Sequence, residues 1–90
     1  MISTWAELSA DRQRTVQKYL DDTAIGKEIA SRAEGDLDFA LWLIAVERAC
    51  QRQFGVSFTD LADYNWRECH ADEMSPQGAL MEAVKDEGLV

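Results

Sequence analysis

The feature that most constrains the fold of this chain is an apolar stretch bounded by two glycines. Residues 37–54 lie between Gly35 and Gly55 and carry large apolar side chains at helical spacing around most of a helix circumference. Asp36 and Asp38 place carboxylates at the amino end, where the helix dipole favours negative charge. A helix that is apolar on most sides must be covered by neighbouring elements. We therefore predict a central buried helix over about residues 37–54.

Start and stop signals divide the rest of the chain into shorter helices. Ser9 is a predicted N-cap for a helix that runs to about residue 22, and residue 22 or 23 caps a further helix that ends at Gly35. Ser75 followed by Pro76 is typical of a helix start, and Gly88 is placed to end that last helix. No segment alternates with the period of two that is typical of a strand. The fold class predicted for residues 1–90 is a single all-α domain, a compact bundle of about four to six short helices.

Two shorter signals are less regular. Thr4 and Glu7 have the spacing of a capping box, which predicts a short opening turn. Ser57 or Thr59 is placed to start another short helix after Gly55, but its end has no clear signal. The segment that follows, up to about residue 74, is the part of the chain with the weakest periodicity.

The charge balance is strongly acidic. The chain has 17 acidic and 9 basic residues, a formal net charge of −8. This disfavours direct nucleic-acid binding, because a phosphate backbone is bound by Lys and Arg side chains. A helix-turn-helix interpretation remains a weaker alternative, since two predicted helices carry clustered bases, each diluted by nearby acids. Those basic residues are Arg12, Arg14, Lys18, Arg48 and Arg52.

The acids of the C-terminal part form a candidate partner-binding surface. Carboxylates spread over rigid helices can imitate a path of phosphates and enter the basic groove of a nucleic-acid-binding protein. Tyr64 and Trp66 lie among these acids and are candidate anchors, with core packing as the alternative. The alternative for the acids is a surface that only keeps the chain soluble. The candidate partner-binding residues are Asp60, Asp63, Tyr64, Trp66, Glu68, Asp72, Glu73, Glu82, Asp86 and Glu87.

Residues with catalytic or metal-binding chemistry are few. His70, the single histidine, follows Cys69 directly, and adjacent helical residues do not face each other. A pair of Cys50 with His70 assembled by the fold is a minor alternative. Glu73 shares a helical face with His70 at i,i+3, but structural zinc sites generally need four nitrogen or sulfur ligands in recognisable spacings. We expect no catalytic residues, no metal and no cofactor.

The sequence also bears on cellular location. The start of the chain has neither a basic region nor an apolar core typical of a secretion signal, and the longest apolar run, residues 39–46, is far too short to cross a bilayer. We expect a cytoplasmic protein with no membrane association. In that compartment Cys50 and Cys69 are expected to be reduced and buried.

The C-terminal half carries a segment of the form G-hydrophobic-S-x-x-D-L-x-D, followed by an S-P-x-x-A helix start. The residues of this pattern are Gly55, Val56, Ser57, Asp60, Leu61, Asp63, Ser75, Pro76 and Ala79. In this half the chain resembles small helical proteins of unknown function encoded by phages, plasmids and other mobile elements. That resemblance implies no catalytic residues. Small acidic proteins of such elements include inhibitors of bacterial defence systems, among them anti-CRISPR proteins, and the chain is similar to these in general character.

The function predicted from these features is that of a non-catalytic protein-binding module. The specific hypothesis is inhibition of a basic nucleic-acid-binding or defence complex through the acidic surface, in the manner of a DNA mimic. The alternative is a structural or homodimerising accessory protein whose acidity only maintains solubility. A chain of 90 residues has a small core, so a bound protein partner or a second copy would add stability.

Overall fold

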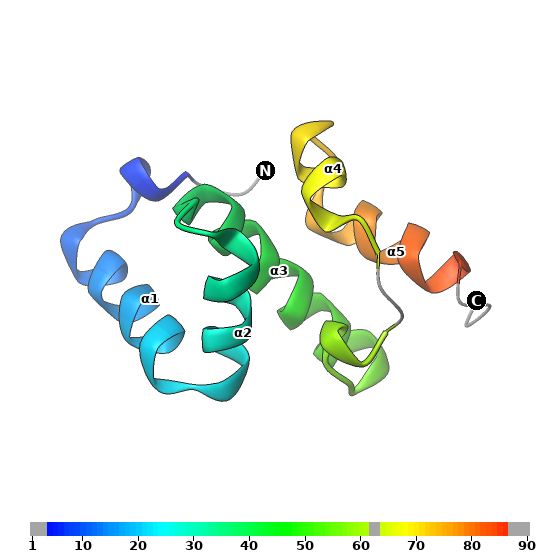
Figure 1. Ribbon diagram of the computed structural model, residues 1–90, viewed down its shortest axis with the longest axis horizontal. Helices are drawn as coiled ribbons and strands as arrows, with labels where there is room; N and C mark the ends of the chain where they lie inside the picture. Colours follow the sequence, from blue (N-terminus) through cyan, green and yellow to red (C-terminus); the bar gives the residue numbers. More distant parts are fainter. Residues whose placement is uncertain (1–3, 62–63, 87–90) are drawn as a thin grey trace. The chain divides into compact units, whose positions relative to one another are not determined.

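The computed structural model describes residues 4–61 and 64–86, and over these residues it is all-α, with no strand (Figure 1). The described helices are α1 (Ala10–Asp22), α2 (Ala24–Ala33), α3 (Leu37–Phe54), α4 (Trp66–Ala71) and α5 (Pro76–Asp86), with 3₁₀ turns η1 (Trp5–Glu7) and η2 (Phe58–Asp60). The all-α prediction and the expected number of helices are confirmed. Within the described part, none of the helices combines the length and the apolarity needed to cross a membrane.

The chain forms two compact units, residues 1–44 and residues 45–90, with the boundary inside α3. The prediction of a single domain over residues 1–90 stays a prediction. In the first unit, α1 and α2 pack side by side as a helical hairpin (Figure 1). Ser9 caps α1 as predicted, because its hydroxyl oxygen accepts the Arg12 N–H at 3.3 Å.

A single residue, Thr23, joins α1 to α2. Its hydroxyl donates to the Tyr19 carbonyl at 2.7 Å and accepts the Gly26 N–H at 2.9 Å, so the same side chain ends one helix and caps the next. The chain turns so tightly that a Cβ on Gly26 would lie 1.9 Å from the Tyr19 carbonyl oxygen. A glycine is therefore required at position 26 for the helices to approach this closely.

The opening turn and the start of α3 are tied together. Both parts of the predicted Thr4–Glu7 capping box are present, and the Thr4 N–H donates to the Glu7 carboxylate at 2.8 Å. The Trp5 N–H donates to the Asp38 carboxylate at 2.7 Å. Asp36 accepts the Phe39 N–H at 3.1 Å and so caps α3. The acids that the sequence places at this helix start thus bind backbone N–H groups directly.

The end of α2 differs from the prediction by one residue. Gly35 has a positive φ of 90°, as expected for a glycine after a helix, but Glu34 already has a left-handed φ of 52°. Glutamate adopts this conformation at a cost, because its Cβ approaches its own backbone.

The core follows the apolar stripes of the sequence. In α3, Phe39, Trp42, Leu43, Val46 and Cys50 are buried, and this helix coincides with the predicted residues 37–54. In the other helices the buried side chains include Leu20, Ile29, Ala33, Leu80, Ala83 and Val84.

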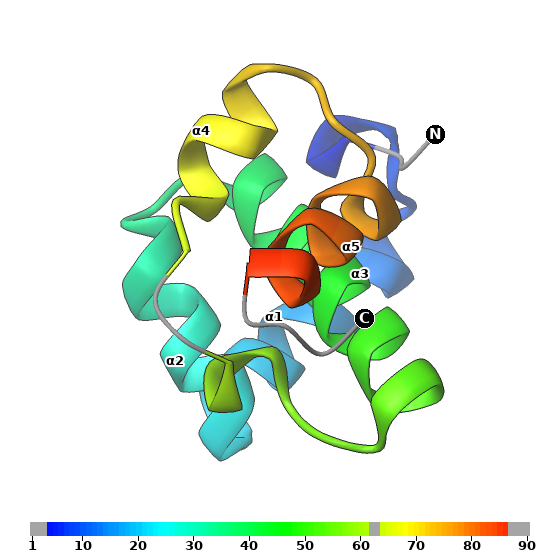
Figure 2. The same ribbon diagram turned by 90° about the vertical axis from the view of Figure 1, so that its right-hand side faces the viewer.

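In the second unit, α4 leads through a short turn into α5, and the two helices pack on each other (Figure 2). Ser75 caps α5 as predicted, accepting the Gly78 N–H at 3.0 Å. Asn65 caps α4, where its amide oxygen accepts the Glu68 N–H at 3.2 Å and its amide nitrogen donates to the Glu68 carboxylate at 2.8 Å. The predicted stop at Gly88 lies outside the described residues.

Helix α4 ends before residue 73, although a shared helix face for His70 and Glu73 requires it to continue that far. Its last residue is Ala71, and Glu73 has a left-handed φ of 61°. The N–H groups of Glu73 and Met74 reach back to the carbonyls of His70 and Cys69, both at 3.0 Å. This is the hydrogen-bond pattern of a Schellman motif, which terminates a helix. The prediction that His70 and Glu73 share a helical face was wrong, because Glu73 lies beyond the helix.

Candidate partner-binding surface

Four carboxylates of the second unit are arranged as two pairs on neighbouring helices. Glu68 lies in α4 and Asp72 caps its carboxyl end, while Glu82 and Asp86 lie in α5. Both pairs have i,i+4 spacing, which puts their side chains on one face of the helix with Cβ atoms about 5–6 Å apart. All four residues are exposed. We call these four residues, together with Tyr64, the acidic face.

Nearby carboxylates affect the ionisation of the Tyr64 and Cys69 side chains. Burial raises the pKa of the Tyr64 hydroxyl, and Cys69, Asp86 and Glu82 raise it further. Burial also raises the pKa of the Cys69 thiol, and Asp72, Glu68 and Glu82 add to this, against a hydrogen bond from Tyr64 that lowers it. Glu82 of α5 acts on both groups. The Cys69 thiol is therefore influenced by carboxylates of both pairs, and the Tyr64 hydroxyl by those of α5.

Tyr64 and Trp66 have different positions. The Trp66 side chain is buried, with 4% exposure, and its ring meets those of Phe58 and Tyr64 edge-on at centroid distances of 5.7 Å and 5.2 Å. Tyr64 is half-buried. Trp66 is thus a core residue that supports Tyr64 and is not itself an exposed anchor, whereas Tyr64 remains partly accessible amid the carboxylates.

The remaining predicted site residues fall in three places. Asp60 is exposed in η2, where its carboxylate accepts the Ser57 N–H at 3.3 Å. Glu73 is exposed in the turn after α4. Asp63 and Glu87 lie outside the described residues.

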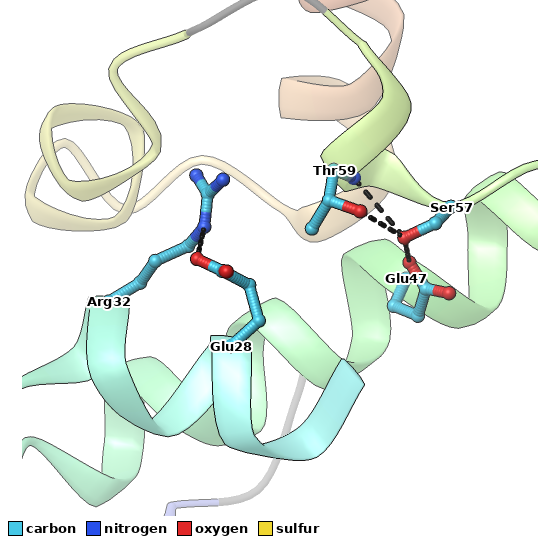
Figure 3. A network of polar contacts seen from close by, with 5 residues as sticks. All are labelled: Glu28, Arg32, Glu47, Ser57 and Thr59. Carbon is cyan, nitrogen blue, oxygen red and sulfur yellow. Dashed lines mark hydrogen bonds and ion pairs between the residues drawn. The ribbon is translucent and has the colours of Figure 1, made fainter. Parts of the chain in front are cut away.

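A buried carboxylate, Glu47 of α3, was not singled out from the sequence. It is 6% exposed. One of its oxygens accepts the Ser57 hydroxyl at 2.8 Å (Figure 3). The same oxygen accepts the Phe58 N–H at 2.9 Å, and the other oxygen accepts the Gln51 side-chain amide at 3.0 Å. Helical spacing in the sequence indicates that position 47 is buried, because it shares a helix face with the buried positions 43 and 50.

The basic residues do not favour the helix-turn-helix alternative. Such a motif presents an exposed helix to the DNA groove, but α3, which follows the α2 turn, is buried along most of its length. In α1, Arg14 forms an ion pair with Asp11 of the same helix. The exposed positions of α5 include Glu82 and Asp86, which would repel phosphate.

The two thiols have an environment that opposes nucleophilic chemistry. Cys50 and Cys69 are free and buried, as expected from the sequence. Burial raises the pKa of Cys50, and nearby Glu47 and Asp60 raise it further. A catalytic cysteine needs a lowered pKa, so that the thiolate forms near neutral pH.

The described part of the chain was also compared with two other kinds of site, a metal centre and a pocket. No group of three or more His, Cys, Asp and Glu side chains is placed to hold a metal ion there. An open hollow in the first unit is lined by residues 5–6 and 35–38. Its carboxylates, Asp36 and Asp38, bind the backbone N–H groups of Phe39 and Trp5. We therefore assign these carboxylates to helix capping.

Comparison with known proteins found no match to a family model, a curated protein or a solved structure.

Proposed function

We propose that this chain is a non-catalytic protein-binding module whose acidic face occupies a basic, nucleic-acid-binding surface of a protein partner. The observation that supports this most is the presence of two exposed i,i+4 carboxylate pairs in one unit, of which the α5 pair, Glu82 and Asp86, raises the pKa of the half-buried Tyr64. Such pairs present negative charge at regular spacing on a helical support, as a nucleic-acid backbone does along its length.

The alignment has an energetic cost that a general solubilising surface does not require. Like charges at i,i+4 destabilise a helix by roughly 0.2–0.5 kcal/mol per pair. A surface of mixed charges would maintain solubility without this cost. The concentration of like charge on α4 and α5 is therefore better explained by a basic binding partner.

The proposed partner is a cytoplasmic protein or complex with a groove rich in Lys and Arg. Occupying that groove would block nucleic acid from entering it, so the chain would act as an inhibitor of the DNA-mimic kind. The resemblance to small proteins of mobile elements favours a defence complex, of the type that anti-CRISPR proteins inhibit, as the target. Association through opposite charges would be fast and would weaken as salt concentration rises.

Charge reversal on α5 tests this proposal. The variant Glu82→Lys/Asp86→Lys changes two exposed residues and leaves the Asn65–Glu68 cap of α4 intact. The control, Asp21→Lys/Asp22→Lys, makes the same change in net charge at exposed positions of α1. We expect the tagged native chain and the control to capture a basic protein from host extract. The α5 variant should retain at least about tenfold less of that protein. Equal capture by all three forms would contradict the proposal.

The alternative, a homodimerising accessory protein, predicts a different surface. Stable dimers usually bury a large, apolar, self-complementary patch. Among the described residues, Val56 is the one large apolar side chain that is exposed, at 39%. Single exposed apolar residues are ordinary on monomeric proteins. Light scattering at two concentrations and two salt levels separates the alternatives, since a stable dimer would support the accessory role.

A further inference from the structure

The conformation of the acidic face depends on a contact made well outside it. Glu47 is the charged side chain that the structure buries among the described residues, and it accepts hydrogen bonds from two groups of the turn that contains η2. Ser57 also caps this turn, since its hydroxyl oxygen accepts the Thr59 N–H at 3.2 Å (Figure 3). Asp60 closes the turn by accepting the Ser57 N–H at 3.3 Å. The Glu47 carboxylate thus binds the turn to α3.

The same turn carries the aromatic ring that supports the acidic face. Phe58, whose N–H binds Glu47, is 1% exposed, and its ring meets Trp66 edge-on. Trp66 in turn meets Tyr64, the aromatic residue of the acidic face. Edge-to-face ring pairs have preferred geometries, so a displaced ring displaces its neighbour. A continuous chain of contacts therefore runs from Glu47 through Phe58 and Trp66 to Tyr64.

We infer that Glu47 is a positioning residue for the acidic face: it fixes the η2 turn on α3 and, through Phe58 and Trp66, sets the position of Tyr64. This inference rests on the proposed function for its biological meaning, but the mechanical link can be tested without any partner. A carboxylate suits this role because it only accepts hydrogen bonds and can receive several at once. The groups that face it from the turn, the Ser57 hydroxyl and the Phe58 N–H, both donate.

The first test replaces Glu47 by an isosteric neutral residue. In Glu47→Gln, one carboxylate oxygen becomes an amide nitrogen that donates, and the remaining oxygen is a weaker acceptor than a charged one. We expect the Phe58 amide to exchange with solvent at least about tenfold faster, while the α5 amides of Leu80 and Val84 keep their native rates. We also expect the NMR resonances of the Trp66 indole and the Tyr64 ring to shift, because ring positions determine them.

Two further variants separate positioning from general stability. Gln51→Ala removes the donor to the other Glu47 oxygen and leaves the turn contacts, so Phe58 exchange and the Tyr64 resonances should stay native. Ser57→Ala removes the hydroxyl that binds Glu47 and also the cap on the Thr59 N–H, but it keeps the carboxylate and its bond to the Phe58 N–H. It should shift the Tyr64 and Trp66 resonances in the same direction, and it serves as the test if Glu47→Gln does not fold.

The inference is overturned if Glu47→Gln, or Ser57→Ala in its place, leaves Tyr64 and Trp66 unshifted. It is equally overturned if exchange accelerates alike at Phe58 and throughout α5, since Glu47 would then stabilise the whole unit without positioning the face. A native chain that captures no basic partner, together with shifted Tyr64 resonances in Glu47→Gln, would refute the proposed function and retain the mechanical link.

Discussion

At the scale of single residues, Glu73 has a strained backbone conformation in the turn that follows α4. It occupies the left-handed residue of the Schellman motif that ends α4, where glycine is usual. We predict that Glu73→Gly raises the free energy of unfolding by about 0.5–1 kcal/mol, because glycine adopts positive φ without steric cost. Chemical denaturation measures this. Glu73→Ala loses the same charge but keeps a Cβ, so equal stability of the two variants would show that the gain came from charge and not from backbone strain.

The two buried thiols predict how stability depends on pH. Burial, as the largest cause, raises the pKa of both Cys50 and Cys69 in the folded chain. The unfolded chain loses thiol protons near the ordinary value of about 8.5, whereas the folded chain holds them at higher pH. Unfolding at alkaline pH therefore releases protons, and this contribution to stability is complete below about pH 8 and is lost as pH rises through the thiol range.

Urea denaturation between pH 7 and pH 9.5 tests that sign. We expect the midpoint of the native chain to fall with rising pH more steeply than that of Cys50→Ala/Cys69→Ala, whatever the absolute stability of the variant. Parallel profiles for the two proteins would contradict the assignment of the slope to the thiols.

At the scale of elements, the helices with strong periodicity could be predicted and those defined by local hydrogen bonds could not. The sequence pattern of α3 fixed both of its ends, because Asp36 caps one and Gly55, with a φ of 70°, follows the other. Helix α4 has six residues, which is too short for an apolar period to appear. It begins at the Asn65 cap, whose sequence signal is Asn followed by Glu68 at i+3, and it ends before Glu73, a residue type that gives no signal of positive φ. The acids of the candidate site could be identified from charge, but the burial of Trp66 and Glu47 depended on contacts between elements.

Helix α5 provides a prediction at this scale. Glu82 and Asp86 repel each other at i,i+4, and Asp86 lies at the carboxyl end, where the helix dipole disfavours negative charge. Asp86→Lys should therefore raise the free energy of unfolding by about 0.5–1 kcal/mol. Asp86→Asn, which removes both unfavourable interactions but adds no positive charge, should give a smaller gain. Thermal unfolding at low ionic strength measures both, and a destabilised Asp86→Lys would mean that this carboxylate has a favourable intramolecular role.

At the scale of the whole molecule, the net charge of −8 is shared by both units, and the described residues of the second unit include two exposed i,i+4 carboxylate pairs. The proposed function rests on this arrangement and not on charge alone, because composition suggests a basic partner without indicating where it would bind. The central claim is that the acidic face and nucleic acid compete for one surface of that partner.

The most direct measurement of this claim is competition on the captured partner. Increasing amounts of the nucleic acid that the partner binds are added to its complex with the native chain, and the retained chain is quantified at constant ionic strength. We expect mutually exclusive binding, so that nucleic acid displaces the chain completely. A lower concentration of nucleic acid should displace the Glu82→Lys/Asp86→Lys variant. A ternary complex that holds both the chain and the nucleic acid would contradict the claim.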